Sequence, residues 1–466
     1  MLFNSEGYGI LLALTLLAYW STKSVPLRQL IVFIASVVFY IQWSFLFVFL
    51  LLGLIILNWV ITVGVYPRNS RLGLWLVVLA NLGILFSFKY LSFFVDNVVD
   101  GLQLVGIAVE SPRIPALLPL GISFYVFELI SYAVDLYNKK MVAERNPLKL
   151  SIFVLFFPHL IAGPICRANQ FMPQIGTLQK LSSDLIVTGA YLFVTGFALK
   201  CGIADGIAPY VNTTFANPGN YGGLDNLLAV VGFGVQIFCD FWGYSLMALG
   251  AAKLFGYDLP SNFNSPYTAR SIQQFWRRWH ITLSNWLRDY LYIPLGGSRD
   301  LSNFKITRNL MITMLLGGLW HGASYNFVIW GGIHGLALSV NRYYHLVRLP
   351  SGVKAVFSWG PMSWILTMAV VFFSWIFFRA PTLSEALMVV SNIFSFGAGY
   401  MQTRLDGVFF ELLGMFVILY FIANKTTNGQ PITHYSIRNQ LLVFSTMFVF
   451  SLIYYVDGAQ FIYFQF

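Results

Sequence analysis

The sequence predicts an all-α polytopic membrane protein, and its composition and apolar runs support that prediction. Hydrophobic residues make up 58% of the 466 residues, charged residues only 10%, and the mean hydropathy is +0.70. Soluble domains hold roughly 45–50% apolar and about 25% charged residues. A membrane span needs roughly twenty residues, and the apolar runs indicate about eleven to thirteen membrane segments, counting broken ones. No stretch has soluble composition, so we expect a single membrane domain over residues 1–466.

The first five apolar runs alternate with loops of changing charge. They are Gly7 to Trp20, Leu30 to Trp43, Phe45 to Val65, Leu74 to Phe94 and Leu118 to Tyr137. Basic residues follow runs one, three and five, whereas the loop Asp96 to Arg113 after run four carries acidic residues. Lys and Arg collect in cytoplasmic loops. The pattern therefore predicts an N-terminus outside the cytoplasm.

Two of the middle runs contain residues that interrupt a regular membrane helix. Leu150 to Ile165 holds Pro158 and the Gly163-Pro164 pair, which favours a broken or re-entrant helix. Such backbone is tolerated at membrane depth only where protein or a wet cavity surrounds it. Leu227 to Phe255 holds Asp240, Gly243 and Tyr244, so we expect it to be bent or split. Leu185 to Ile203 between them is a plain apolar run.

A long polar interruption from Gly256 to Arg308 combines basic and aromatic residues. Its six arginines are Arg270, Arg277, Arg278, Arg288, Arg299 and Arg308. Aromatic and aliphatic residues alternate with them from Phe275 to Leu291, which predicts an amphipathic helix or helix pair at the cytoplasmic interface. The later predicted segments are Leu310 to Trp320, Phe327 to Val340, Phe357 to Phe378, Leu383 to Phe396, Val408 to Ala423 and Gln440 to Tyr455.

His321 is the candidate general base. It ends an apolar run between Trp320 and Gly322, one turn after Gly317 and Gly318, where small residues let a backbone or a substrate approach closely. The pKa of histidine lies near working pH, which suits proton transfer. The alternative is a core histidine that bonds to a neighbouring helix. His334, thirteen residues later in the chain, is interpreted as packing, and His159 as lining a cavity.

Several partner and cofactor classes are disfavoured. The net charge of +10 is explained by cytoplasmic loops, so we expect no nucleic acid partner. Histidine, cysteine and carboxylate spacings match no metal motif, and we expect no metal and no bound cofactor. Arg277, Arg278 and Arg288 either bind phosphates or anchor the chain on anionic lipid. Two classes stay open: an enzyme that uses a phosphate-bearing cytosolic donor, and a transporter with intramembrane polar residues.

Several motifs resemble the membrane-bound O-acyltransferase family, in particular its bacterial branch, which includes the membrane subunit of alginate O-acetylation. They extend over the whole chain and are Leu118 to Tyr125, Phe157 to Pro164, Asp240 to Ser245, Phe275 to His280, Trp286 to Gly297, Gly317 to Gly322 and Phe461 to Phe466. The resemblance implies broken or re-entrant helices around a central tunnel. It also implies transfer of an acyl group from a cytosolic thioester, such as acetyl-CoA, to a hydroxyl outside.

The resemblance also implies roles for particular residues. His321 matches the family's catalytic histidine, His280 a second polar position across the same tunnel, and His159 a histidine of the alginate-type proteins. The expected catalytic residues are therefore His321 and His280. The expected substrate-binding residues are His159, Arg277, Arg278, Asn285, Arg288 and Trp320.

Partners and location follow from the same resemblance. The expected location is the bacterial plasma (inner) membrane, with lipid around a multi-pass chain. The expected partners are the thioester donor, an extracytoplasmic acyltransferase, and an exopolysaccharide or wall polymer as acceptor. Acetyl is the favoured group. Transfer of D-alanyl from a carrier protein to a wall polymer is the alternative, and a transporter is the alternative from a different class.

Overall fold

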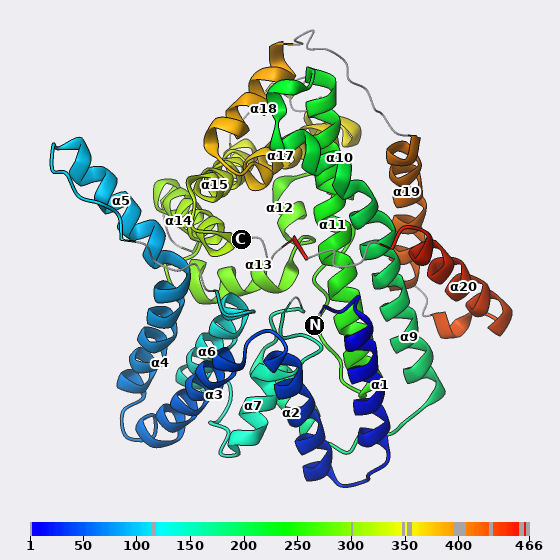
Figure 1. Cartoon of the computed structure of the whole chain (residues 1–466). Coiled ribbons are helices and arrows are strands. Elements are labelled where there is room, and N and C mark those ends of the chain that lie inside the picture. The colour runs from blue at the N-terminus through cyan, green and yellow to red at the C-terminus, as the bar shows by residue number, and fades with distance from the viewer. Residues whose placement is uncertain are drawn as a thin grey trace. The chain divides into compact units, whose positions relative to one another are not determined.

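The computed structural model describes residues 2–112, 118–161, 163–299, 302–346, 350–351, 357–395, 407–427, 432–455 and 461–462. Throughout these ranges the regular structure is helical (Figure 1). The described chain divides into two compact units: residues 1–185, 251–259 and 322–324 form the first, and residues 186–250, 260–321 and 325–466 the second. The expectation of a single domain over residues 1–466 stays a prediction.

In the first unit, residues Ser70–Leu104 form one long helical stretch, and the other helices are shorter. Its helices are α1 (Glu6–Trp20), α2 (Val25–Ile41), α3 (Phe45–Val60), α4 (Ser70–Leu85), α5 (Leu91–Leu104), α6 (Ile122–Tyr137), α7 (Pro147–Leu155) and α8 (Ala168–Ile175). The π-helical segment η1 (Ile61–Val65) extends α3. A second π-helical segment, η2 (Phe86–Tyr90), joins α4 to α5. Within this unit α1 packs on α2, α2 on α7, and α4 on α6.

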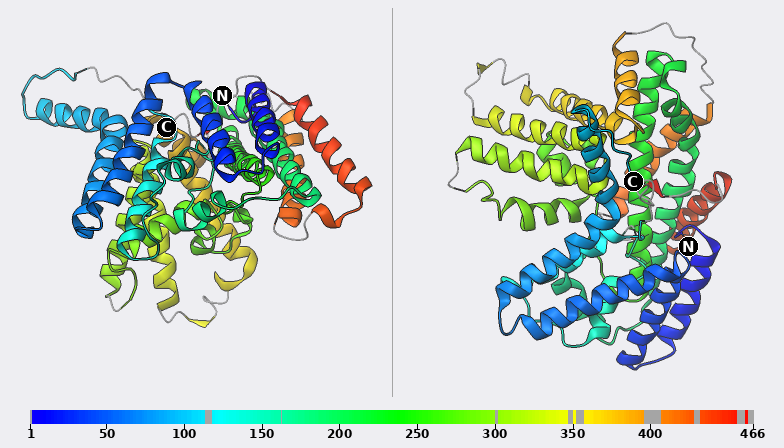
Figure 2. Two further views of the ribbon diagram at one scale, coloured as in Figure 1. Left: turned by 90° about the horizontal axis from the view of Figure 1, so that it is seen from below. Right: turned by 60° about the vertical axis from the view of Figure 1, so that its left-hand side comes forward.

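The second unit contains the longest helix and the later hairpins. Its helices are α9 (Ser183–Phe197, which begins in the first unit), α10 (Asp205–Ala216), α11 (Gly223–Leu254), α12 (Ile272–Trp276), α13 (Ile281–Leu287), α14 (Asn303–His321), α15 (Tyr325–Leu346), α17 (Gly360–Arg379), α18 (Leu383–Ser395), α19 (Gly407–Thr427) and α20 (Ile437–Ile453). Short turns η3 (Ala198–Ala204), η4 (Pro218–Asn220), η5 (Pro266–Thr268), η6 (Arg288–Tyr292) and η7 (Ile432–His434) connect them. Helices α14 and α15 lie side by side in all the ribbon views (Figures 1 and 2).

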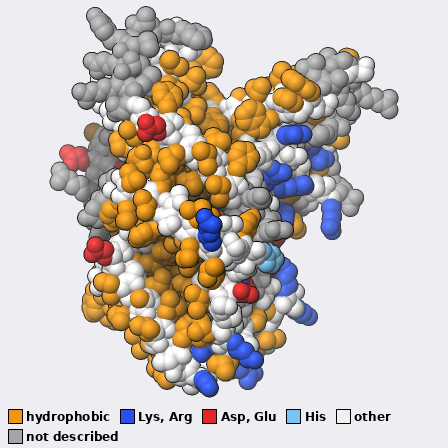
Figure 3. All heavy atoms as spheres, turned by 90° about the vertical axis from the view of Figure 1, so that its right-hand side faces the viewer, with side chains coloured by type: hydrophobic (Ala, Val, Ile, Leu, Met, Phe, Trp, Pro, Cys, Tyr) orange, Lys and Arg blue, Asp and Glu red, His pale blue; other side chains and the backbone are white. Residues whose placement is uncertain are grey.

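The membrane character predicted from composition is confirmed. Five described helical stretches are long and apolar enough to span a membrane: Phe45–Val65, Ser70–Leu104, Ser183–Ala216, Gly223–Leu254 and Gly360–Arg379. Five shorter apolar helices accompany them: Glu6–Trp20, Val25–Ile41, Leu383–Ser395, Gly407–Ile422 and Ile437–Ile453. Many large apolar side chains are exposed, and hydrophobic atoms cover most of the face drawn in Figure 3. Such a surface suits lipid rather than water.

Two predicted boundaries are wrong. The loop expected from Asp96 begins only after Leu104, because α5 continues the long helix of α4 past the acidic residues. The split expected as one alternative near Asp240 is absent, since α11 is one continuous helix of 32 residues, and the bend, the other alternative, stays a prediction. Gly243 lies against α9. A Cβ there would lie 2.6 Å from the Gly196 carbonyl oxygen, so this glycine lets α9 approach closely.

Other predicted elements are confirmed. The interrupted run Leu150 to Ile165 is a helix, α7, that ends at Leu155, followed by a non-helical connection. The two runs around Ser324 form the hairpin of α14 and α15. The basic-aromatic stretch contains the short helices α12 and α13, so the helix pair is confirmed, whereas its place at the cytoplasmic interface stays a prediction. Phe275 on α12, Leu283 on α13 and Trp279 between them are buried.

A buried ion cluster explains how α11 tolerates a carboxylate at its middle. The Lys200 Nζ atom lies 2.6 Å from Asp205 Oδ1 and 2.7 Å from Asp240 Oδ1. The second oxygen of Asp240 accepts a hydrogen bond of 2.7 Å from the Ile462 amide, which holds the tail to α11. All three side chains are at most 6% exposed. One cation therefore offsets two buried carboxylates.

Removing that cation is expected to destabilise the second unit strongly. Lys200→Met leaves Asp205 and Asp240 buried without their partner, and breaking a buried pair costs about 3–5 kcal/mol. Thermal unfolding of the detergent-purified protein measures the loss. The matched control is Lys253→Met, because Lys253 pairs with Asp258 at 2.7 Å at the surface, where a pair contributes only about 0–1 kcal/mol. Equal unfolding temperatures for the two variants would contradict this account.

Candidate active site

The hairpin of α14 and α15 places His321. A Cβ on Gly318 would overlap the Phe327 carbonyl oxygen, and one on Gly331 would overlap the Met314 carbonyl oxygen. The backbones of α14 and α15 thus come into contact at Gly318 and Gly331. The small residues before His321 predicted the close approach of a backbone or a substrate, and at Gly318 it is the α15 backbone that approaches. His321 follows as the last residue of α14.

The His321 imidazole is enclosed by aromatic rings. Its centroid lies 5.0 Å from Trp330 and 5.1 Å from Phe378, and both rings meet it edge-on. Phe327 lies further away, at 6.4 Å. Only 4% of His321 is exposed. Rings on α15 and α17 therefore restrict how this imidazole can turn and keep water away from it.

His280 occupies the turn between α12 and α13 in an unusual backbone conformation. Its φ of 40° is in the left-handed region, which non-glycine residues rarely adopt. The Ile281 amide donates to the Asn262 carbonyl oxygen at 2.9 Å and helps to hold this turn. Such strain persists only where the surrounding structure enforces it, and it is concentrated at functional sites.

A hydrogen-bond network around Asn262 sets the protonation of His280. The Asn262 Oδ1 atom accepts from Thr282 Oγ1 at 2.6 Å and lies 3.3 Å from His280 Nδ1. The Asn262 amide nitrogen donates to Ser245 Oγ at 3.1 Å. The oxygen of Asn262 therefore faces the histidine, and this assignment puts the ring proton on Nδ1. The Nε2 atom is buried without a hydrogen-bond partner among the described residues.

The protonation state of His280 is neutral. The residue lies outside the five candidate spans, and burial lowers its pKa to about 3. Its ring therefore carries no charge at any physiological pH. A neutral ring with its proton on Nδ1 presents a lone pair at Nε2, which can accept a hydrogen bond or a proton.

Trp320 connects the two histidines. Its ring centroid lies 5.0 Å from that of His321 and 5.9 Å from that of His280. His280 also meets Phe241 of α11 edge-on at 4.6 Å. Residues 280 and 320, forty positions apart in the chain, thus meet in one buried aromatic cluster. The structure brings His280, Trp320 and His321 together, as the resemblance implied.

His334 has a packing role, as predicted. Its Nδ1 atom accepts from Trp276 Nε1 at 3.3 Å, and its Nε2 atom lies 3.0 Å from Ser374 Oγ. The serine hydroxyl donates to the Val371 carbonyl at 2.7 Å. The Trp330 ring lies 4.7 Å from His334 and, as described above, also packs on His321. His334 therefore ties α12, α15 and α17 together next to the rings that enclose His321.

The predicted phosphate-binding arginines differ in what already holds them. Arg288 pairs through Nε with Asp289 Oδ1 at 2.7 Å, which cancels its charge locally. Arg278 donates from Nη1 to Thr268 Oγ1 at 2.6 Å. Arg277 is exposed, and its side chain makes no hydrogen bond or ion pair in the described part of the chain. Asn285 is half-buried on α13. Of the three arginines, Arg277 is thus the most available to an anion.

His159 belongs to the first unit, whereas the other predicted site residues belong to the second. Its ring is buried against Phe156 and Phe171, with both centroids at 5.6 Å. Its Nε2 atom lies 3.2 Å from the Phe153 carbonyl oxygen. The role of His159 in substrate binding stays a prediction.

Sequence reasoning missed the residues that orient the two candidate histidines. Asn262 lies in the long polar interruption, eighteen residues before His280, and no local pattern distinguishes it from a loop asparagine. Phe241, Trp330 and Phe378 come from three helices and look like ordinary apolar positions. Only the spacing of His334 from His321 hinted that α15 would face the site.

The arrangement can support proton transfer to and from a hydroxyl at a buried site. Two imidazoles lie in one buried cluster, and the free lone pair of His280 is set by Asn262. A buried, oriented base of this kind contributes by taking a proton as a bond forms at the oxygen. Water exclusion strengthens each electrostatic contact in such a site.

Comparisons with known proteins agree with this chemistry. Residues 141–384 match the model of the membrane-bound O-acyltransferase family, MBOAT. The chain is 36% identical over 444 residues to the probable alginate O-acetylase AlgI of Pseudomonas aeruginosa, covering 93% of this chain and 83% of that protein. It is 36% identical over 392 residues to the peptidoglycan O-acetyltransferase of Helicobacter pylori, covering 77% and 72%.

A third relative shares less of the chain. It is the teichoic acid D-alanyltransferase of Bacillus subtilis, 30% identical over 234 residues, which cover 48% of this chain and 59% of that protein. The family match includes His159, His280 and His321, and the first two relatives extend over most of the chain. The chain therefore belongs to the membrane-bound O-acyltransferase family, and it is a multi-pass membrane enzyme that transfers acyl groups to hydroxyls.

Proposed function

We propose that this enzyme moves an acetyl group from a cytosolic thioester, acetyl-CoA or a related donor, to a hydroxyl of an extracytoplasmic polysaccharide. The observation that supports it most is the buried cluster in which Trp320 contacts both His280 and His321. Two relatives named as O-acetylating enzymes of polymers cover 93% and 77% of the chain. Acetyl is preferred over D-alanyl because the D-alanyltransferase relative covers only 48%.

The proposed reaction assigns a separate task to each histidine. His321 takes the proton of the acceptor hydroxyl as its oxygen attacks the thioester carbonyl. The carbon–sulfur bond then breaks, the thiolate leaves, and the proton passes from His321 to the thiolate. His280 orients the acceptor by accepting a hydrogen bond at Nε2 from a second hydroxyl of the polysaccharide, because the proton of the attacking hydroxyl goes to His321. The Nδ1 proton favours this orienting role over polarisation of the thioester, because polarisation would need a donor at Nε2.

The donor and acceptor are proposed to enter from opposite sides. Arg277, with Arg278 and Arg288 nearby in the chain, receives the phosphates of the donor on the cytosolic side. The acceptor reaches the histidines from outside, where an extracytoplasmic acyltransferase receives the group or hands it on to an exopolysaccharide or wall polymer. The proposed location is the bacterial plasma (inner) membrane, which such a topology requires. Family membership favours the enzyme over a transporter.

Removal of the proposed base should abolish transfer without unfolding the protein. His321→Ala is expected to lower kcat roughly 10²- to 10⁴-fold, the usual contribution of a general base. Release of CoA from radiolabelled acetyl-CoA, measured on purified protein in nanodiscs, reports the rate. His434→Ala is the control, since His434 is exposed. Wild-type turnover in a correctly inserted His321→Ala protein would show that His321 is not the base.

The same assay decides between donors. If wild type is inactive with acetyl-CoA but transfers from a D-alanyl carrier protein, the proposed acyl group is wrong and the wall-polymer alternative holds. If the wild type releases CoA only when a soluble polysaccharide fragment is added, the transfer requires its acceptor. Both outcomes leave the family assignment unchanged.

The network around His280 makes Asn262 a positioning residue. Asn262→Ala frees the imidazole to change its tautomer and should lower kcat roughly tenfold, with the KM for the donor unchanged. Asn262→Asp keeps an acceptor oxygen for the Nδ1 proton and should retain more activity. Because both residues act as one unit, the double variant with His280→Ala should be no slower than His280→Ala alone. Additive losses would mean that Asn262 acts independently of His280.

Substitution of Arg277 and of Arg288 should change the KM for the donor to different extents. Arg277→Ala removes the exposed cation that has no protein partner, and we expect a roughly tenfold rise in the KM for acetyl-CoA, equal to about 1.4 kcal/mol. Arg288→Ala is the matched comparison, because Asp289 already neutralises Arg288, and its KM should rise much less. The KM for acetyl-pantetheine, which lacks the nucleotide phosphates, should stay unchanged in both variants. An equal effect of Arg277→Ala on both donors would argue against phosphate binding.

A further inference from the structure

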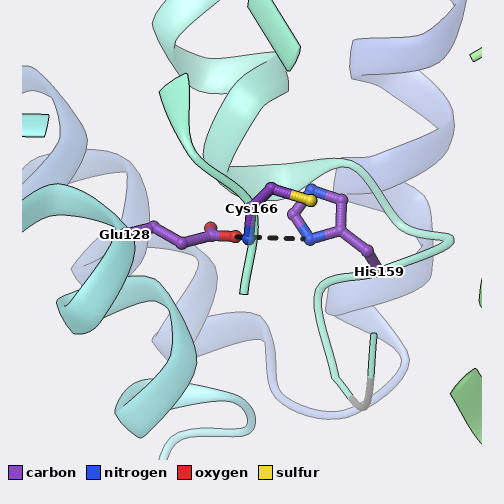
Figure 4. A group of neighbouring side chains, drawn as sticks. All are labelled: Glu128, His159 and Cys166. Atoms are coloured by element: carbon purple, nitrogen blue, oxygen red, sulfur yellow. Dashed lines mark hydrogen bonds and ion pairs between the residues drawn. The ribbon is translucent and has the colours of Figure 1, made fainter. Parts of the chain in front are cut away.

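Three side chains with metal-ligand chemistry meet inside the first unit, in a place that the proposed transfer reaction does not use. They are Glu128 on α6, His159 in the connection after α7, and Cys166 just before α8 (Figure 4). Their candidate ligand atoms all lie within 4.8 Å of one another. None of the three is more than 2% exposed. Ionisable groups so deeply buried in a membrane protein are functional candidates.

The chain between α7 and α8 is shaped to bring two of these groups to α6. The His159 amide donates to the Phe156 carbonyl at 2.9 Å, and the Gly163 amide donates to the His159 carbonyl at 3.0 Å. A Cβ at Gly163 would overlap the His159 backbone, so this return of the chain requires glycine. The Cys166 amide then donates to Glu128 Oε1 at 3.1 Å. The turn thus holds His159 and Cys166 against the same carboxylate.

The orientation of the His159 ring is that of a metal ligand. Its Nε2 atom lies 3.2 Å from the Phe153 carbonyl oxygen, which can only accept, so the ring proton is on Nε2. The Nδ1 lone pair consequently faces Glu128 (Figure 4). The Cys166 thiol belongs to the same group. Histidines that bind metals usually donate their other ring N–H to a carbonyl or carboxylate in this way.

The spacing of the group also fits a metal better than a direct hydrogen bond. His159 Nδ1 and Glu128 Oε1 are 3.6 Å apart, beyond the usual range for an N–H···O bond. Zinc–nitrogen and zinc–oxygen bonds of roughly 2.0–2.2 Å, at tetrahedral angles, separate the two ligand atoms by roughly 3.3–3.6 Å. A thiolate and a carboxylate carry two negative charges, which one divalent cation cancels.

We propose that Glu128, His159 and Cys166 bind a zinc ion. Thiolate and imidazole ligands favour Zn²⁺ over Mg²⁺, Ca²⁺ and Mn²⁺, which prefer oxygen. In the described part of the chain no fourth His, Cys, Asp or Glu joins the group, so water or the second carboxylate oxygen completes the coordination. The ion links α6 to the α7–α8 connection, 38 residues away, and stabilises the first unit. This role does not depend on the proposed acetyl transfer.

Metal content is the first test. The full-length protein is purified in detergent with a tag that contains no histidine, from cells grown with added zinc, and its metals are measured by mass spectrometry. About one zinc per chain is expected for the wild type, and less than a tenth of that for Cys166→Ser and His159→Gln. Cys239→Ser is the matched control, because Cys239 is also a buried thiol but lies on α11. Wild-type protein without zinc, or Cys166→Ser with a full zinc content, overturns the proposal.

A second measurement identifies the ligands and remains informative if one variant fails to fold. Cobalt exchanged into the wild type should give a thiolate-to-cobalt absorption band. The band should be retained in Cys239→Ser and lost in Cys166→Ser. If Cys166→Ser is unfolded, Glu128→Gln serves instead, and its band should be shifted. A chelator should lower the unfolding temperature of wild type and Cys239→Ser. Absence of the thiolate band in the wild type, together with an unfolding temperature that chelation leaves unchanged, contradicts a zinc site. These readouts are independent of acyl transfer.

Discussion

The backbone contact between α14 and α15 is the constraint on which the candidate active site depends. Gly318 and Gly331 each face a carbonyl oxygen of the other helix, so any side chain at either position would push the pair apart. His321 lies three residues after Gly318, and Trp330 comes directly before Gly331. The position of the histidine relative to the rings that enclose it is therefore set by two glycines. Small residues allow this close packing where lipid supplies no hydrophobic drive.

Three buried histidines show how surroundings assign different tasks to one residue type. His334 has hydrogen-bond partners at both ring nitrogens, Trp276 and Ser374, and packs helices together. His280 has a partner only at Nδ1, which leaves a lone pair in a buried cluster. His159 directs its Nε2 proton to a carbonyl and its lone pair to a carboxylate, in a group that also contains a thiol. A count of histidines cannot separate these cases, because the distinction depends on which groups face each nitrogen.

Much of the fold follows from the sequence, because long apolar runs leave the backbone no alternative to helix at membrane depth. The α14–α15 hairpin and the interruption after α7 were predicted from this and from Pro and Gly positions. The predicted split at Asp240 is wrong for a physical reason. A carboxylate within an apolar run looks like a break, yet Lys200 and the Ile462 amide satisfy it without one. Neither partner is local, so no window of sequence around residue 240 contains them.

The sequence by itself determined the membrane class, the helical architecture and the family, and it predicted His280 and His321 as catalytic candidates, because composition and short motifs depend only on residues close together in the chain. Tertiary structure alone decided what each histidine faces. It brought Asn262 to His280, Trp320 between two imidazoles, and Glu128 to His159 and Cys166. The physical reason is that hydrogen bonds and metal ligation act over about 2–4 Å between side chains tens of residues apart, so only the packing of helices can create them.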